Sequence, residues 1–193
     1  MQSAIGRAGL WTMLVLAVGV AIYSFRFAAV PAHIWFGIDP GIRGVIERVP
    51  FQALGHMIVA PIALLVGPFQ FVTAIRARRP ALHRTMGKIY VAACLIAGAS
   101  ALAVLWITTT FGAWRAAVQR KFALHQLLMK FSYAMTFGAV TLRLQIPFFM
   151  MDGFPSYSAA SVWLAYTSWI PNVIVVALWE MAKALRAPRA VAA

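Results

Sequence analysis

Acidic residues and cysteines are both scarce in this chain of 193 residues, which has four Asp and Glu residues in total and one cysteine. A single cysteine excludes a disulfide framework and any CxxC metal or redox pair. Charged residues make up 11% of the chain, against roughly a quarter in soluble domains, so the surface of a soluble globular protein is excluded as well. The sequence also lacks a phosphate loop, a zinc spacing and a nucleophile–base–acid set, and it does not decide whether the protein is an enzyme.

Hydrophobic residues are abundant instead, at 63%, and they run in blocks of membrane-spanning length. A helix needs about 20 apolar residues to cross the hydrocarbon core of a bilayer. We therefore predict an all-α fold, a polytopic transmembrane helical bundle that forms one integral membrane domain over residues 1–193. About five membrane segments are expected, at residues 8–29, 51–75, 89–113, 127–151 and 159–182, and the third is ambiguous.

The formal charge of +13 is concentrated at the ends of these apolar blocks. This placement argues against nucleic acid as a partner and favours contact with the bilayer and its anionic headgroups. Arg76–Lys88, Arg115–Lys130 and the C-terminal tail carry most of the basic residues. The positive-inside rule then predicts that these stretches and the N-terminus are cytoplasmic, in a multi-pass protein of the bacterial inner membrane.

A short sequence frame occurs twice, as ALHRTMGK at Ala81–Lys88 and as ALHQLLMK at Ala123–Lys130. Each copy follows a basic run, so both are expected to be helix starts at the cytoplasmic interface. That assignment needs an even number of crossings between the copies. Ile89–Ala113 holds only twenty-five residues, whereas two full crossings need about forty. Three solutions remain open: one crossing against the charge bias, a hairpin of half-helices bent near Ala97–Ser100, or a helix that this chain lacks.

Four stretches carry a resemblance to a known family: GHMIVAPIALLVGPFQF (55–71), ALHRTMGKIYV (81–91), ALHQLLMKFSYAMTFGAVTLRLQIP (123–147) and WIPNVIVVALWE (169–180). In this order they resemble the bacterial membrane proteins grouped as domain of unknown function 2306. The resemblance covers about Gly55 to Glu180 and implies a membrane protein, but no reaction. It also implies two helices between the two histidine frames, with about a helix-length of sequence missing here.

Polar residues inside membrane segments are costly, so they mark candidate sites. By depth they fall into an outer set (His56, Arg143, Gln145) and an inner set (Gln70, His83, His125, Glu180), with Asn172 near mid-membrane. Arg143 either faces the bundle and binds an anionic or carbonyl-bearing ligand, or extends to the headgroups. His83 and His125 are either interfacial or axial ligands of a haem iron, and apart from such an iron no metal is expected.

Two functions remain open on this basis. The first is a haem b or quinone-binding electron-transfer membrane protein, with His56, His83, His125 and Arg143 as the cofactor-binding residues. The second is a non-enzymatic membrane subunit, or a lipid- or partner-binding protein with a basic cytoplasmic face, whose partner is another membrane protein or a second copy.

Overall fold

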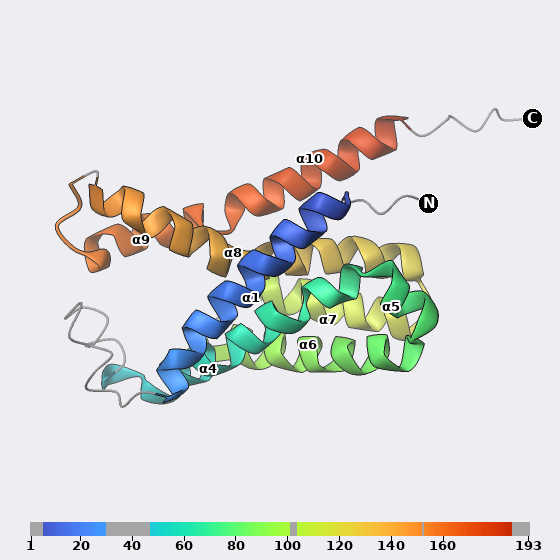
Figure 1. Cartoon of the computed structure of the whole chain (residues 1–193), viewed down its shortest axis with the longest axis horizontal. Helices are drawn as coiled ribbons and strands as arrows, with labels where there is room; N and C mark the ends of the chain where they lie inside the picture. The colour runs from blue at the N-terminus through green and yellow to red at the C-terminus, as the bar shows by residue number, and fades with distance from the viewer. Residues whose placement is uncertain (1–5, 30–46, 101–103, 152, 187–193) are drawn as a thin grey trace, which may run out of the picture.

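The computed structural model describes residues 6–29, 47–100, 104–151 and 153–186, and every regular element in these ranges is helical (Figure 1). The prediction of an all-α bundle is therefore confirmed. The elements are α1 (Arg7–Ala29), α4 (Pro50–Val66), the 3-10 helix η1 (Pro68–Phe71), α5 (Thr73–Arg78), α6 (Pro80–Ser100), α7 (Val104–Val118), α8 (Phe122–Met151), α9 (Tyr157–Thr167) and α10 (Ile170–Arg186).

Four helical stretches in the described ranges are long and apolar enough to cross a membrane, judged by length and composition. They are Ala8–Phe25, Pro50–Phe71, Phe122–Met151 and Ala159–Arg186. The last of these is interrupted, because α9 ends at Thr167 and α10 begins at Ile170. Pro171 lies at the second position of α10, where its missing N–H costs nothing and its ring prevents α9 from continuing.

The ambiguous segment at residues 89–113 is two antiparallel helices, α6 and α7, which pack against each other (Figure 1). A single straight helix between the two histidine frames is therefore excluded. The predicted reversal of the chain near Ala97–Ser100 is correct. The two helices of this hairpin are longer than half-helices, however, since α6 has 21 residues and α7 has 15. The estimate from the sequence failed because it counted only the apolar part, whereas α6 begins in the basic flank at Pro80 and α7 ends at Val118.

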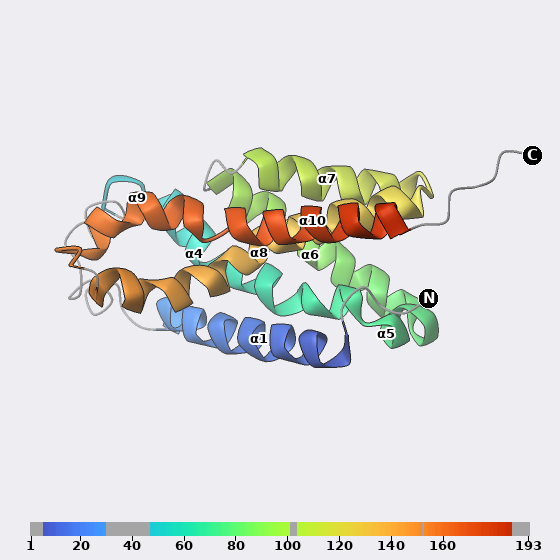
Figure 2. The same cartoon turned by 90° about the horizontal axis from the view of Figure 1, so that it is seen from above.

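This hairpin brings both histidine frames to one end of the bundle, where α1 begins and α10 ends (Figures 1 and 2). We name it the basic end, because it carries eleven Lys and Arg residues whose side chains are described: Arg76, Arg78, Arg79, Arg84, Lys88, Arg115, Arg120, Lys121, Lys130, Lys183 and Arg186. The opposite end, called the far end, has two described cationic side chains, Arg48 and Arg143.

Small residues allow the helices of the core to approach closely. Ala93 and Ala97 of α6 are buried against the other central helices, in one cluster with Ala63 of α4. At Gly98 an added Cβ would lie 2.8 Å from Cγ1 of Ile107, so the α6–α7 contact requires glycine there. A second cluster, of Ala17, Ala21, Leu64 and Val140, joins α1 to α4 and α8 near the candidate site.

Candidate functional site

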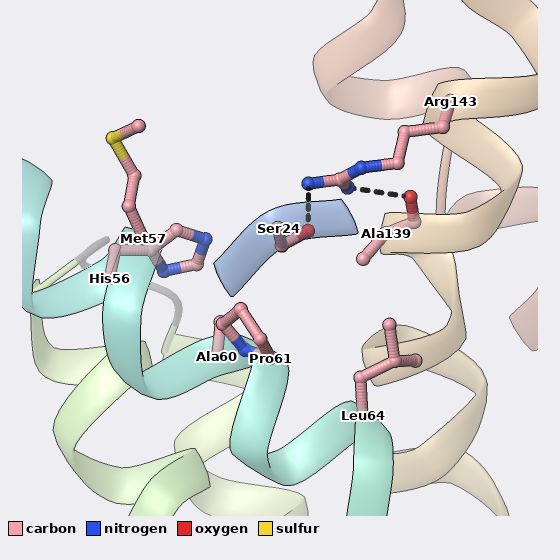
Figure 3. A pocket seen from close by; sticks show the side chains of 8 residues that line it. All are labelled: Ser24, His56, Met57, Ala60, Pro61, Leu64, Ala139 and Arg143. Atoms are coloured by element: carbon pink, nitrogen blue, oxygen red, sulfur yellow. Dashed lines mark hydrogen bonds between the residues drawn. The ribbon is translucent and has the colours of Figure 1, made fainter. Parts of the chain in front are cut away.

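A pocket of about 90 Å³ lies toward the far end between α1, α4 and α8 (Figure 3). We name it the far pocket; its lining residues are Ser24, His56, Met57, Ala60, Pro61, Leu64, Ala139 and Arg143. The structure thus brings together two of the predicted residues, His56 and Arg143. Figure 3 shows the imidazole and the guanidinium extending toward Ser24 from opposite sides.

Arg143 is held against the bundle by hydrogen bonds from two nitrogens of its guanidinium. Nη1 donates to the carbonyl oxygen of Ala139 at 2.9 Å, and Nη2 donates to Oγ of Ser24 at 2.7 Å. The Ser24 hydroxyl in turn donates to the carbonyl of Val20 at 2.8 Å, so its oxygen is turned toward the arginine. The side chain therefore faces the interior of the bundle and lines the pocket, instead of extending away to headgroups.

His56 is fixed by a hydrogen bond to a neighbouring helix. Its Nδ1 lies 3.0 Å from the carbonyl oxygen of Ala97 on α6, and the ring packs edge-on against Trp106 with centroids 6.4 Å apart. A carbonyl only accepts, so Nδ1 carries the proton in this bond. In the neutral ring Nε2 then has a lone pair, which can accept a proton or a hydrogen bond.

The third member of the predicted outer set, Gln145, does not line the far pocket. Its Nε2 donates to the carbonyl of Thr167 at 3.2 Å, and its Oε1 accepts from the Thr167 hydroxyl at 3.1 Å. Asn172 also links helices, since its Nδ2 donates to the carbonyl of Ala134 at 3.2 Å and to Oγ1 of Thr141 at 2.9 Å. Both amides attach the last two helices to α8.

His83 and His125 both lie at the basic end, three residues into α6 and α8. Nδ1 of His125 donates to the carbonyl of Ala113 at 2.9 Å, which leaves Nε2 as the basic nitrogen of the neutral ring. Burial first, and then the nearby charges of His125 and Arg76, lower the pKa of His83 below its ordinary value of 6.5. The effect of His125 shows that the two rings are close enough to interact.

The other two members of the inner set differ in their surroundings. Glu180 accepts a hydrogen bond from Nζ of Lys130 at 2.6 Å, and both side chains are only 20% exposed. This ion pair connects α10 to α8. Gln70 packs on Gly87 of α6, and its Nε2 is buried without a hydrogen-bond partner in the described part of the chain.

A group of buried hydroxyls between α6, α7 and α8 was not identified from the sequence. Oη of Tyr90 lies 2.9 Å from the oxygens of both Ser132 and Thr136, and Oγ of Ser132 lies 2.6 Å from Oγ1 of Thr110. Nε1 of Trp106 donates to Thr136 at 3.0 Å. We name these five residues the hydroxyl cluster. The spacing of Ser132 and Thr136, one helical turn apart, was the available signal.

The chemistry of these groups is that of binding and proton exchange. The far pocket offers a cationic donor and an imidazole nitrogen that can accept a hydrogen bond, and most of its other lining side chains are apolar. No group of three or more His, Cys, Asp or Glu side chains within the described ranges is arranged to hold a metal ion.

Comparison with known proteins identifies one family. The model of the family described as "Predicted membrane protein (DUF2306)" matches residues 53–103 and 98–180 of the chain. No curated protein and no solved structure matches the chain.

Proposed function

We propose, from the premise that this chain belongs to the predicted membrane protein family DUF2306, that it binds a quinone head group in the far pocket and takes part in membrane electron transfer. One observation carries the proposal: His56 on α4 and Arg143 on α8 line the same pocket and are each fixed by a hydrogen bond to the backbone. The other walls are mostly apolar, as a hydrophobic ring requires.

The two polar side chains suit the two oxidation states of a quinone. A quinone carbonyl accepts a hydrogen bond, and a guanidinium such as that of Arg143 donates several in a fixed plane. A quinol hydroxyl donates, and Nε2 of His56 accepts when Nδ1 holds its proton on Ala97. The pocket can therefore hold either oxidation state of the head group by a hydrogen bond.

The size of the pocket favours a head group over an enclosed macrocycle. Its volume of about 90 Å³ is well below the roughly 300–1,000 Å³ of sites that enclose a whole ligand. A quinone can thus place its ring in the pocket and leave its tail in the bilayer.

Calorimetric titration of the detergent-purified protein with a short-chain benzoquinone tests this proposal. Arg143→Met is expected to weaken binding roughly 10- to 100-fold, because a hydrogen bond to a charged group contributes about 1.5–3 kcal/mol. Arg48→Met removes the exposed arginine of the same end and should leave binding unchanged. Absence of binding to the wild type, or equal affinities of Arg143→Met and the wild type, would contradict the proposal.

A second candidate is haem b held between α6 and α8 by His83 and His125. The specific support is that both histidines lie in the first turn of a helix that begins at the basic end, and that Nδ1 of His125 donates to Ala113, which orients Nε2 as metal-bound histidines require. Oxidised and dithionite-reduced absorption spectra after haem-replete expression test it. A Soret band that disappears in His125→Ala supports haem binding, and a wild type without a Soret band rules it out.

A third candidate is non-enzymatic, with the basic end as a binding surface for anionic lipid headgroups, another membrane protein or a second copy. The excess of cationic side chains at this end supports it, and also supports a cytoplasmic basic end and N-terminus in a bacterial inner membrane. Purification in mild detergent tests it. A stable partner or bound anionic phospholipid that persists after His83 and His125 become alanine favours this function over haem binding.

A further inference from the structure

Three buried polar atoms have no hydrogen-bond partner in the described part of the chain: Nε2 of Gln70, Nδ1 of His83 and Oη of Tyr133. They come from η1, α6 and α8, and Tyr133 is only 4% exposed. A buried polar group without a partner costs roughly 1–3 kcal/mol, and native proteins rarely retain one. Three such atoms in neighbouring elements therefore point to something that bonds to them.

The three side chains line one seam at the junction of η1, α6 and α8. Gln70 packs on Gly87, where a Cβ would lie 3.2 Å from its Oε1. Gly87 is one turn beyond His83, so Gln70 meets the face of α6 that carries this histidine. The ring of Tyr133 packs directly on Gly67, whose carbonyl accepts from the backbone N–H of Gln70 at 3.0 Å. We name this place the basic-end seam.

The seam has the surface at one end and the hydroxyl cluster at the other. Toward the surface, His83 is close to His125 and Arg76. Toward the interior, the ring of Tyr133 lies beside that of Tyr90, with centroids 6.4 Å apart. Tyr90 belongs to the hydroxyl cluster, in which each hydroxyl can both donate and accept.

The chemistry of the three unpaired atoms suits water as an occupant. Amide, imidazole and phenol groups are neutral hydrogen-bonding partners, and an internal water bonds to two to four such groups. The described part of the seam has no carboxylate to attract a cation.

We propose that the basic-end seam is a water-filled inlet that brings solvent, and with it exchangeable protons, from the basic end to the hydroxyl cluster around Tyr90. The water bonds to Gln70, His83 and Tyr133 and supplies their missing partners. The proposal is independent of quinone binding, because the inlet and the far pocket lie toward opposite ends of the bundle and share no residue.

Cysteine accessibility in the purified protein tests the inlet, with a small, charged methanethiosulfonate as the probe. In a Cys94→Ser background, Gln70→Cys should react within about tenfold of the rate at exposed Arg84→Cys, because the thiolate formed in water is the reacting species. Ala93→Cys, in the dry core of α6, is the matched control and should react at least about 100-fold more slowly than Gln70→Cys. Equal slow rates at Gln70→Cys and Ala93→Cys would overturn the proposal.

Thermal unfolding gives an independent readout. If water bonds to Oη of Tyr133, Tyr133→Phe lowers the midpoint temperature, whereas removal of a truly unpaired hydroxyl raises it. Tyr90→Phe is the control, since its hydroxyl is bonded and its loss lowers the midpoint in either case. A raised midpoint in Tyr133→Phe overturns the inlet. A second result would also overturn the inlet: the midpoint temperature of the wild type rises in chloride but not in gluconate, and Tyr133→Phe shows no such rise. The occupant would then be an anion.

Discussion

Arg120 has a left-handed backbone conformation, with a φ of 57°, at the point where α7 ends. The N–H of Lys121 donates to the carbonyl of Ala116 at 2.8 Å, and that of Arg120 donates to Ala117 at 3.0 Å. These bonds form a Schellman motif, in which glycine is the preferred residue at the left-handed position. The motif turns the chain into α8 and so positions the second histidine frame.

The first prediction concerns this position. Arg120→Gly should raise the free energy of unfolding by up to about 1 kcal/mol, because glycine has no Cβ to clash in the left-handed region. Arg120→Val removes the same charge but should lower it by about 1 kcal/mol or more, since a β-branched residue tolerates this region poorly. Thermal unfolding of both variants in one detergent measures the difference. Equal midpoints would show that the turn is not strained.

A second prediction concerns His83 and pH. Its pKa is lowered in the folded protein by burial, His125 and Arg76, so the folded state binds this proton less well than the unfolded state. The contribution of neutral His83 to the stability of the folded protein is therefore complete above pH 6.5, the ordinary pKa of the residue. This contribution is lost as the pH falls from there through the lowered pKa of the folded state. His83→Gln should flatten this decline in midpoint temperature between about pH 7 and pH 5. An unchanged slope would show that other groups cause it.

The polar residues were grouped from the sequence by their position along the helices. The side of the helix on which each one lies was not considered in that grouping. His56 and Arg143 were grouped by depth and do share a pocket, although their binding role stays a prediction. Gln145 was grouped with them and faces α9 instead. Two residues along a helix correspond to about 200° of rotation, so Arg143 and Gln145 cannot share a face. The partners of the hydroxyl cluster depend on three helices and could not be paired from sequence.

At the scale of elements, the repeated ALH frame is explained by two parallel helix starts. α6 and α8 both begin at the basic end, each with a histidine in its first turn. The sequence predicted the start sites but not the length of the helices, because basic residues inside α6 and α7 were counted as loop. Arg84, Lys88 and Arg115 are helical and exposed, and their long side chains can reach the headgroups from within a helix.

The third prediction concerns how α10 is attached to α8. Lys130→Met leaves the carboxylate of Glu180, which is only 20% exposed, with Lys183 at 3.9 Å as its remaining ion-pair partner among the described residues. We expect a loss of about 1–3 kcal/mol in unfolding free energy, between the values for exposed and for buried ion pairs. The double variant Lys130→Met/Glu180→Gln should recover much of this loss, since no carboxylate is then left unpaired. A double variant less stable than Lys130→Met would contradict this account.

At the scale of the whole molecule, the hairpin of α6 and α7 reconciles charge with chain length. With both helices present, the loops after α5 and α7 and the end of α10 lie at one end, as the positive-inside rule requires (Figure 2). The side of the membrane that this end faces stays a prediction. A single crossing between the histidine frames would instead place the loop after α7 on the side opposite to the loop after α5.

Cysteine labelling in intact cells distinguishes these two topologies. Gln119→Cys places a thiol in the loop after α7, and Pro155→Cys places one in the loop between α8 and α9; both positions are exposed. A membrane-impermeant maleimide should label Pro155→Cys in intact cells, but Gln119→Cys only after permeabilisation, because the positive-inside rule predicts that the basic end faces the cytoplasm. The native Cys94 is buried and should stay unlabelled in the parent protein.

Labelling of Gln119→Cys in intact cells, with Pro155→Cys protected, would reverse the orientation. Labelling of both, or protection of both, would contradict the arrangement of α8, which places these two loops at opposite ends.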